Sequence, residues 1–123
     1  MKILLVEDSK VLGPALVGVI KQDGHECVWC KDGLEALAKL KTYTPDVILL
    51  DIMLPKISGF EICARIKKDE RLWRIPVIIL STLSSKDYKE RALTSGADHF
   101  VEKPYDLKEV LKEVYKFRAK DTK

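Results

Sequence analysis

The sequence lacks the features by which membrane and secreted proteins are recognised. No uninterrupted apolar run approaches the roughly 20 residues that a helix needs to cross a bilayer. The first residues, MKILLVEDS, contain one lysine and a short apolar run, but two acids follow at once and no small-residue cleavage site appears. We therefore expect neither a membrane span nor a signal peptide, and we expect a cytoplasmic location.

Cysteine is also scarce. The chain has three cysteines, Cys27, Cys30 and Cys63. This number is small and odd, which argues against a disulfide framework and suits a reducing compartment. Cys27 and Cys30 have the CxxC spacing of a redox or zinc motif, but in a strand residues three apart point to opposite faces. No second ligand pair accompanies them, so we favour a structural role for these thiols.

Neither sign of charge dominates. The 22 basic and 19 acidic residues give a net charge of +3 and are spread along the chain, which is too little to predict nucleic-acid binding. An apolar content of 46% with 33% charged residues is typical of a soluble globular protein and excludes a disordered chain. The length of 123 residues suits one domain, and no repeat or linker divides it. We expect a single domain over residues 1–123.

Five short apolar segments alternate with helix-like patterns, which is the signature of parallel strands joined by crossover helices. Three segments are continuously apolar, as strands buried on both faces must be, and are predicted at the centre of the sheet: residues 3–6, 47–50 and 77–80. The segments 27–29 and 99–101 are shorter and more mixed, which favours positions nearer the edges. The predicted fold class is α/β, a doubly wound parallel sheet with helices on both faces.

Helical periodicity fills the gaps between these segments. Five helices are predicted: from residues 9–13 to about 23, behind Asp32, from about 58 to 66, near 85–95, and behind Asp106. Asp32 and Asp106 are expected to cap their helices, because an aspartate oxygen can accept from the free N–H groups of a first turn. The fourth helix has a thin apolar stripe, so we expect it to pack loosely.

Ligand sites in an open parallel sheet lie at the carboxyl ends of the strands. Side chains of compatible chemistry stand at those ends: Glu7 and Asp8 after the first strand, Asp51 after the third, Ser81 after the fourth and Lys103 after the fifth. Each has an ordinary structural explanation by itself, as a helix cap, a strand terminus or a surface charge. Their convergence on one edge indicates a functional site.

Carboxylates brought this close repel one another, so a cation is expected to join them. Mg²⁺ binds through one or two carboxylates, keeps several waters and leaves positions for phosphate oxygens. Asp51 can then attack phosphorus and form an acyl phosphate, because the ion neutralises both reacting groups. Lys103 offers a positive charge to a second phosphate oxygen and the Ser81 hydroxyl can donate to a third.

The blocks ILLVEDS, PDVILLDIMLP followed by SGFE, IPVIILST and GADHFVEKPY occur in this order along the chain. They resemble the successive blocks of the CheY-like receiver domains of response regulators, which act in two-component phosphorelay signalling. The resemblance covers the whole chain. It implies a five-stranded sheet in the order 2-1-3-4-5 with five helices, the flavodoxin-like receiver fold.

The resemblance also implies roles for residues of the acidic cluster. Asp51 matches the phosphoacceptor, Asp8 a direct magnesium ligand, and Glu7 an acid that usually acts through water. Met53 matches the position whose backbone carbonyl binds the ion. The implied cofactor is therefore Mg²⁺, in agreement with the chemistry of the acids.

Three further positions match the family's phosphate-binding and switch residues. Ser81 matches the hydroxyl residue, Lys103 the phosphate-binding lysine and Phe100 the aromatic switch residue. Thr82 departs from the pattern, because the family typically has Ala or Gly there. Its β-branched side chain narrows access to the phosphoryl group, which leaves the lifetime of phosphorylation open.

The implied partners are a histidine kinase or phosphotransfer protein as phosphodonor, and a downstream protein on the face of the fourth helix, fifth strand and fifth helix. We expect a signalling domain rather than an enzyme, with no direct nucleic-acid or membrane contact. The domain is expected to be a monomer or to dimerise on phosphorylation. It could be free-standing or part of a longer regulator.

Two alternatives fit part of the same site. A magnesium-dependent phosphatase with an aspartyl nucleophile needs a second acid two residues further on as general acid or base, and Met53 stands there instead. An interaction module without phosphorylation is expected to have lost an acid, the hydroxyl or the lysine, and none is lost. We therefore favour the phosphoacceptor interpretation.

Four other conspicuous residues are expected to be structural. His25 and His99 have no partner histidine or cysteine at ligand spacing. Trp29 and Trp73 are not interleaved with basic residues, as a base-stacking surface would require.

Overall fold

The computed structural model describes residues 1–52, 54, 56–81, 86–102 and 107–121. The elements within these residues follow one another along the chain as β1 (Lys2–Val6), α1 (Leu12–Gln22), β2 (Glu26–Cys30), α2 (Gly33–Leu40), β3 (Val47–Asp51), α3 (Gly59–Lys68), β4 (Val77–Ser81), α4 (Lys86–Thr94), β5 (His99–Glu102) and α5 (Leu107–Asp121). All strand pairs are parallel, in the order β2-β1-β3-β4-β5. The predicted α/β fold and strand order are confirmed.

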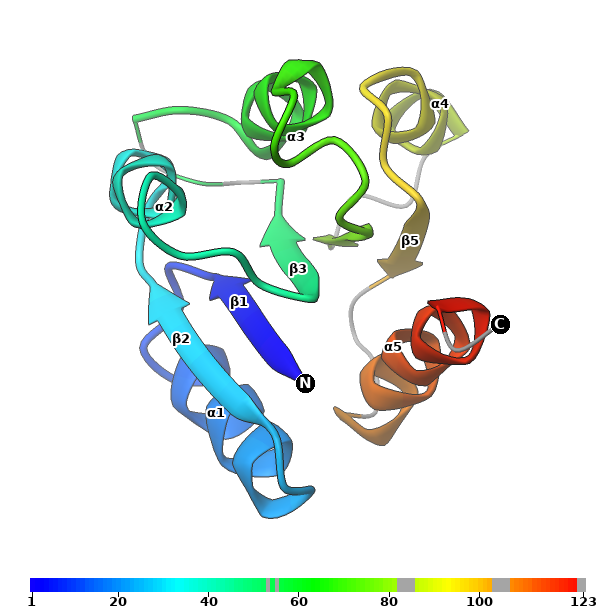
Figure 1. Ribbon diagram of the computed structural model, residues 1–123. Coiled ribbons are helices and arrows are strands. Elements are labelled where there is room, and N and C mark those ends of the chain that lie inside the picture. The colour runs from blue at the N-terminus through cyan, green and yellow to red at the C-terminus, as the bar shows by residue number, and fades with distance from the viewer. Residues whose placement is uncertain (53, 55, 82–85, 103–106, 122–123) are drawn as a thin grey trace.

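The sheet lies between two layers of helices (Figure 1). Helices α1 and α5 cover one face, and α2, α3 and α4 cover the other. Successive residues of β1 alternate between these layers, since side chains along a strand point to opposite faces. Leu4 and Val6 pack toward α2 and α3, whereas Ile3 and Leu5 pack toward α1 and α5. The chain therefore has an apolar core on each side of the sheet.

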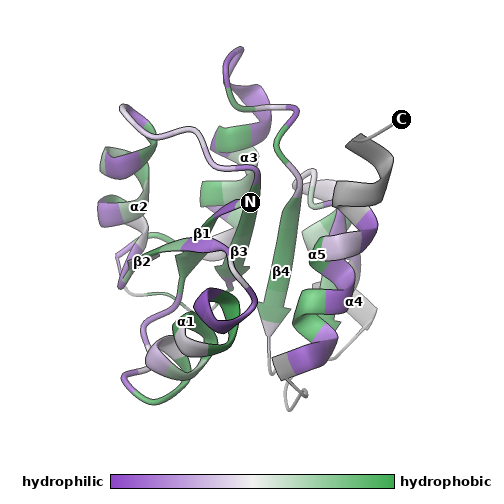
Figure 2. Ribbon diagram, turned by 60° about the horizontal axis from the view of Figure 1, so that its bottom comes forward, coloured by the Kyte–Doolittle hydropathy of each residue, from purple (hydrophilic) through white to green (hydrophobic). Residues whose placement is uncertain are grey.

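Burial distinguishes the central strands from the edges. Every residue of β3 and β4 is buried, while most of β2 and all of β5 are at least partly exposed. Figure 2 shows the hydrophobic character of β4 against the mixed surfaces of the helices. Four strands extend beyond their predicted ends, to Cys30, Asp51, Ser81 and Glu102. These side chains are consequently held by the sheet rather than by the loops that follow it.

Helix starts agree with the sequence where they are described. The Asp32 side chain accepts from the Glu35 N–H at 2.8 Å, and Ser58 caps α3 by accepting from the Glu61 N–H at 3.3 Å. The Glu35 N–H is also the main reason why the pKa of Asp32 is lowered. The predicted cap Asp106 lies outside the described residues.

Helix α1 begins differently, because its N-cap residue Val11 makes no capping bond through its side chain. The Ser9 hydroxyl instead accepts from the N–H groups of Val11 and Leu12, at 3.2 and 3.0 Å. The helix still starts within the predicted window of residues 9–13. It ends before Gly24, whose φ of 86° lies in the left-handed region that favours glycine.

The described side chains of helix α4 present little apolar surface to the core. Among its side chains that the structure describes, residues 90–94, only Ala92 is buried, and Leu93 is 59% exposed. The Arg91 guanidinium lies 4.4 Å from the centre of the Phe60 ring, so a cation–π contact joins α4 to α3.

Of the described helices, none has the length and apolar character needed to cross a bilayer.

The two CxxC thiols lie on opposite sides of the sheet. Cys30 belongs to the core on the α2 and α3 side, and Cys27 packs against the core on the α1 and α5 side. Both are free, and burial raises the pKa of each to about 11. Thiols so weakly acidic are mostly uncharged near neutral pH and poor metal ligands. The prediction that the two thiols point to opposite faces of the strand is confirmed.

The two histidines, His25 just before β2 and His99 in β5, both contact helix α5. Nδ1 of the buried His25 lies 2.9 Å from the Met1 amino nitrogen, and its Nε2 lies 3.0 Å from the Tyr115 hydroxyl. His99 Nε2 lies 3.0 Å from a Glu113 carboxylate oxygen. These contacts support the structural roles expected for both rings.

Candidate functional site

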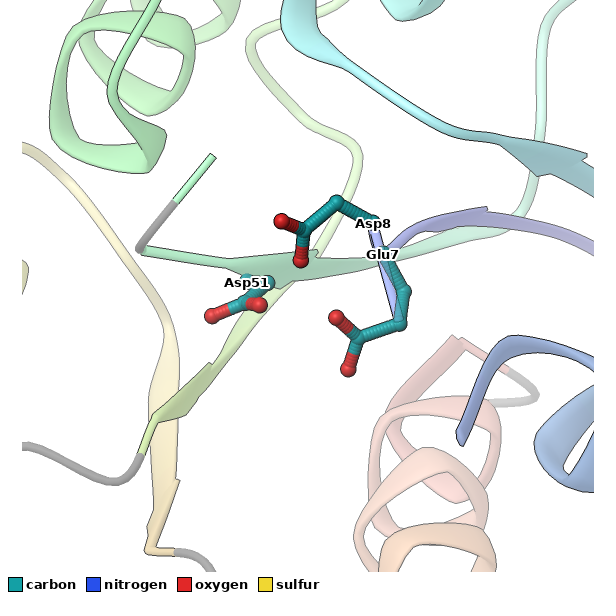
Figure 3. Close-up of side chains that lie close together, drawn as sticks. All are labelled: Glu7, Asp8 and Asp51. Atoms are coloured by element: carbon teal, nitrogen blue, oxygen red, sulfur yellow. The ribbon is translucent and has the colours of Figure 1, made fainter. Parts of the chain in front are cut away.

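Three carboxylates meet at the carboxyl edge of the sheet. Glu7, Asp8 and Asp51 each have an oxygen within 4.8 Å of one from each of the other two. Figure 3 shows the three side chains together, two from the end of β1 and one from the end of β3. They meet because β1 and β3 are adjacent parallel strands, with Val6 paired to Leu50 immediately before the acids.

Burial differs among the three acids. The Glu7 and Asp51 residues are only 0% and 5% exposed, whereas Asp8 is exposed. Charged carboxylates are rarely buried unless they are paired or bind a metal. Oxygen donors at this spacing suit a hard divalent ion such as Mg²⁺, for which Asp8 offers a solvent-accessible ligand. The donor set thus fits the cofactor that the sequence predicts.

The backbone after β1 is held by β2. The Glu7 N–H donates to the Cys30 carbonyl at 3.0 Å, and the Trp29 indole Nε1–H donates to the Glu7 carbonyl at 2.8 Å. The Ser9 N–H lies 3.4 Å from a Glu7 carboxylate oxygen, a long hydrogen bond within the turn. Residues 7–9, called the acidic turn below, are therefore held by hydrogen bonds to both the N–H and the carbonyl of Glu7.

The backbone after β3 is held by α3. The Gly59 N–H donates to the Ile52 carbonyl at 2.9 Å. A Cβ at Gly59 would lie 2.3 Å from the Asp51 carbonyl oxygen and 2.7 Å from the Ile52 Cα. Such distances are too short for any side chain, so the first turn of α3 can approach Asp51 this closely only with glycine at position 59.

Ser81 and Phe100 lie on the same side of the sheet. Ser81 is fully buried at the end of β4, which is the strand next to β3. Ile79, two residues earlier on the same face of β4, belongs to the core on the α2, α3 and α4 side. Phe100 is paired with Ile79 and packs against that core while remaining partly exposed. The hydroxyl and the ring thus face the helix layer that contains α4.

Two predicted site residues, Met53 and Lys103, lie outside the described residues, as does Thr82. The structure brings together Glu7, Asp8 and Asp51 and places Ser81 at the end of the next strand. The chemical roles of all these residues stay predictions.

Sequence reasoning missed two residues that hold the site. Trp29 was expected to be merely structural, and Gly59 was noted only as part of the segment SGFE that resembles the receiver family. An indole at the end of the strand beside the acids was a possible signal for the first. Glycine in the first turn of the helix that follows Asp51 was a possible signal for the second.

The chain belongs to the response regulator receiver domain family, whose model matches residues 3–115. It is similar to the DNA-binding dual master transcriptional regulator RpaA of Synechocystis sp., with 34% identity over 113 residues. That match covers 92% of this chain and 47% of RpaA, so the chain spans about half the length of that relative. Protein PilG of Pseudomonas aeruginosa is 32% identical over 111 residues, covering 90% of this chain and 82% of PilG.

A solved structure leads to the same family. The receiver domain of the Francisella response regulator 1452 is 32% identical, with a TM-score of 0.89 and coverage of 99% of this chain and 98% of that one. Receiver domains are signalling domains of two-component systems and interact with histidine kinases and downstream partners. The family and the flavodoxin-like receiver fold that the sequence indicated are confirmed.

Proposed function

We propose that Asp51 accepts a phosphoryl group from a histidine kinase or phosphotransfer protein in a Mg²⁺-dependent reaction. The observation that carries this proposal is the cluster of Glu7, Asp8 and Asp51 oxygens within 4.8 Å at the carboxyl edge of a receiver fold. The nucleophile and two acids suited to hold an ion are then within reach of one phosphoryl group.

In the proposed transfer, a carboxylate oxygen of Asp51 forms a bond to phosphorus. The bond between phosphorus and the donor's imidazole nitrogen breaks, and its electron pair stays on that nitrogen. Asp8 and Glu7 would hold Mg²⁺ together with Asp51 and the Met53 carbonyl, and the bound ion would neutralise charge on the carboxylate and the phosphoryl oxygens. Lys103 and Ser81 would bind phosphoryl oxygens, since transfer depends chiefly on positioning and charge stabilisation.

The proposed output is a change in the face formed by α4, β5 and α5. Phosphorylation adds acceptor oxygens within reach of the Ser81 hydroxyl, which would draw the end of β4 inward. Phe100, partly exposed against the same core, would then turn toward α4. The small buried surface of α4 over its described side chains, residues 90–94, supports this route, because weakly held elements change conformation at low cost.

Further expectations are part of this proposal. One receiver domain over residues 1–123 would act as a signalling domain rather than an enzyme, in the cytoplasm. It would be a monomer or a phosphorylation-dependent dimer without direct nucleic-acid or membrane contact. RpaA is a DNA-binding transcriptional regulator, but this chain matches only 47% of that protein.

The first prediction tests the phosphoacceptor. A small-molecule phosphodonor with Mg²⁺ should add one phosphoryl group to the protein, detected by intact mass, and chelating the metal should abolish the addition. Asp51→Asn should remove it, because the amide is no nucleophile toward phosphorus.

Asp32→Asn is the matched control, since asparagine caps a helix as well as aspartate and Asp32 lies outside the acidic cluster. This variant should be phosphorylated like the parent protein. Equal phosphorylation of Asp51→Asn and the parent would overturn the assignment.

A further inference from the structure

Trp29 connects the edge strand β2 to the acidic turn. Its indole Nε1–H donates to the Glu7 carbonyl at 2.8 Å, and its partly buried ring packs against the core on the α1 and α5 side. The Lys31 ammonium lies 5.6 Å from the ring centre. The indole therefore has a fixed place between β2, the acidic turn and α1.

Helix α1 leaves space for this indole. A Cβ built at Gly13 would lie 2.3 Å from the Trp29 Cζ2 atom and 2.8 Å from its Nε1 atom. Any side chain at position 13 would therefore collide with the donor end of the ring. Gly18, five residues further along the same helix, has nothing within 4 Å of its Cβ position. The close approach is thus specific to Gly13.

The Trp29 hydrogen bond acts on the peptide group between Glu7 and Asp8. This group is planar, so its carbonyl oxygen and the Asp8 nitrogen turn together. The preceding peptide is already fixed by the bond from the Glu7 N–H to the Cys30 carbonyl at 3.0 Å. Fixing the next peptide sets the direction in which the chain enters Asp8, and hence where the Asp8 carboxylate stands relative to Asp51.

We propose that Trp29 is a positioning residue for metal binding, which holds Asp8 in its ligating position through the Glu7 carbonyl, and that Gly13 supplies the space this requires. The inference rests on the proposed Mg²⁺-dependent function and adds a residue on β2 to it. Groups that orient ligands commonly affect metal affinity although they do not touch the ion. Trp29 would act in this way on the Asp8 backbone.

Trp29→Phe is the direct test, because phenylalanine keeps an aromatic ring but removes the N–H donor. Calorimetric titration with Mg²⁺ should give a dissociation constant about two- to tenfold higher than that of the parent, the range expected for one lost neutral hydrogen bond. Trp73→Phe is the matched control: Trp73 is 49% exposed, lies against Arg74 and should leave the constant unchanged.

Gly13→Ala tests the same contact without altering Trp29. The new methyl group should displace the indole and raise the dissociation constant for Mg²⁺ in the same direction as Trp29→Phe. Gly18→Ala on the same helix should leave it unchanged, since the added methyl group meets no atom. This pair keeps the test decisive if Trp29→Phe does not fold.

A metal-free measurement separates positioning from a general structural effect. In the ¹⁵N spectrum of the parent without metal, the Trp29 indole N–H should exchange with water more slowly than that of Trp73, and Gly13→Ala should remove this protection. Parent-like Mg²⁺ affinity in folded Trp29→Phe and Gly13→Ala proteins would overturn the positioning role alone. A parent protein that binds no Mg²⁺ would instead overturn the proposed function on which the inference rests.

Discussion

At the scale of single residues, the site depends on groups that are costly elsewhere in a fold. Glu7 and Asp51 place two carboxylates in nearly complete burial, beside a third from Asp8. Like charges this close disfavour the folded state, and a bound cation would relieve that repulsion. Gly59 adds a purely steric requirement, because α3 begins against the backbone of Asp51. These residues are better explained by function than by stability.

Gly59→Ala should destabilise the protein by about 1 to 3 kcal/mol, the usual cost of forcing an extra carbon into a packed contact. The new Cβ would collide with the Asp51 carbonyl and the Ile52 backbone, neither of which can move without shifting β3. Urea unfolding followed by circular dichroism measures the loss.

Gly18→Ala is the control for this helix substitution. It should be neutral or more stable by up to about 1 kcal/mol, because alanine favours a helix and the position is open. If Gly59→Ala and Gly18→Ala unfold at the same urea concentration, the close packing of α3 on Asp51 does not require glycine for stability.

At the scale of elements, helices α3 and α4 are attached to the sheet differently. Lys67 of α3 donates to Asp98 and to the Ile75 carbonyl, both at 2.8 Å, and so ties α3 to the segments on either side of β4. Helix α4, by contrast, buries only Ala92 among its described side chains. The amino end of β4 is thus anchored, whereas the described side chains of α4 contribute little burial. A signal from the site would move α4 more readily than α3.

Phe100→Ala should separate phosphorylation from this response. Addition of a phosphoryl group at Asp51 should stay nearly unchanged, because Phe100 lies on β5 outside the acidic cluster. The NMR shift changes that a beryllofluoride complex produces in residues 86–102 should shrink by about half or more, since the ring that would transmit the movement is gone.

Leu34→Ala is a suitable control, since Leu34 is an exposed apolar residue of α2. Its beryllofluoride response should match that of the parent. Parent-like shift changes in Phe100→Ala would exclude the ring as the connection between the site and α4.

At the scale of the whole molecule, one cation would act on the stability of the entire fold. The acids come from β1 and β3 at the centre of the sheet, so the folded state brings together ligands that the unfolded chain separates. A ligand that binds only the folded state stabilises it in proportion to the logarithm of its concentration. Metal binding and global unfolding should therefore be linked.

Saturating Mg²⁺ should raise the free energy of unfolding by about 1 to 3 kcal/mol, as expected when the free ion exceeds its dissociation constant by one to two orders of magnitude. Thermal unfolding with and without a chelator measures the gain. Asp8→Ala should shrink it, because an exposed ligand is lost without disturbing the core. A parent melting temperature that ignores millimolar Mg²⁺ would count against the site.

The sequence by itself determined the α/β class, the central and edge strands and the convergence of Glu7, Asp8 and Asp51. These features follow from local patterns: burial on both faces makes a strand continuously apolar, and parallel strands end at one edge. The cap Asp32 was predictable for the same reason, since it bonds within its own helix turn.

Only the tertiary structure decided which distant groups touch. The contact of Trp29 with Glu7 needs the register of β2 on β1 and the approach of α1 at Gly13. The requirement for Gly59 depends on how closely α3 packs on the end of β3. Neither is encoded in a short stretch of chain, because both depend on the relative placement of elements that are separate in sequence.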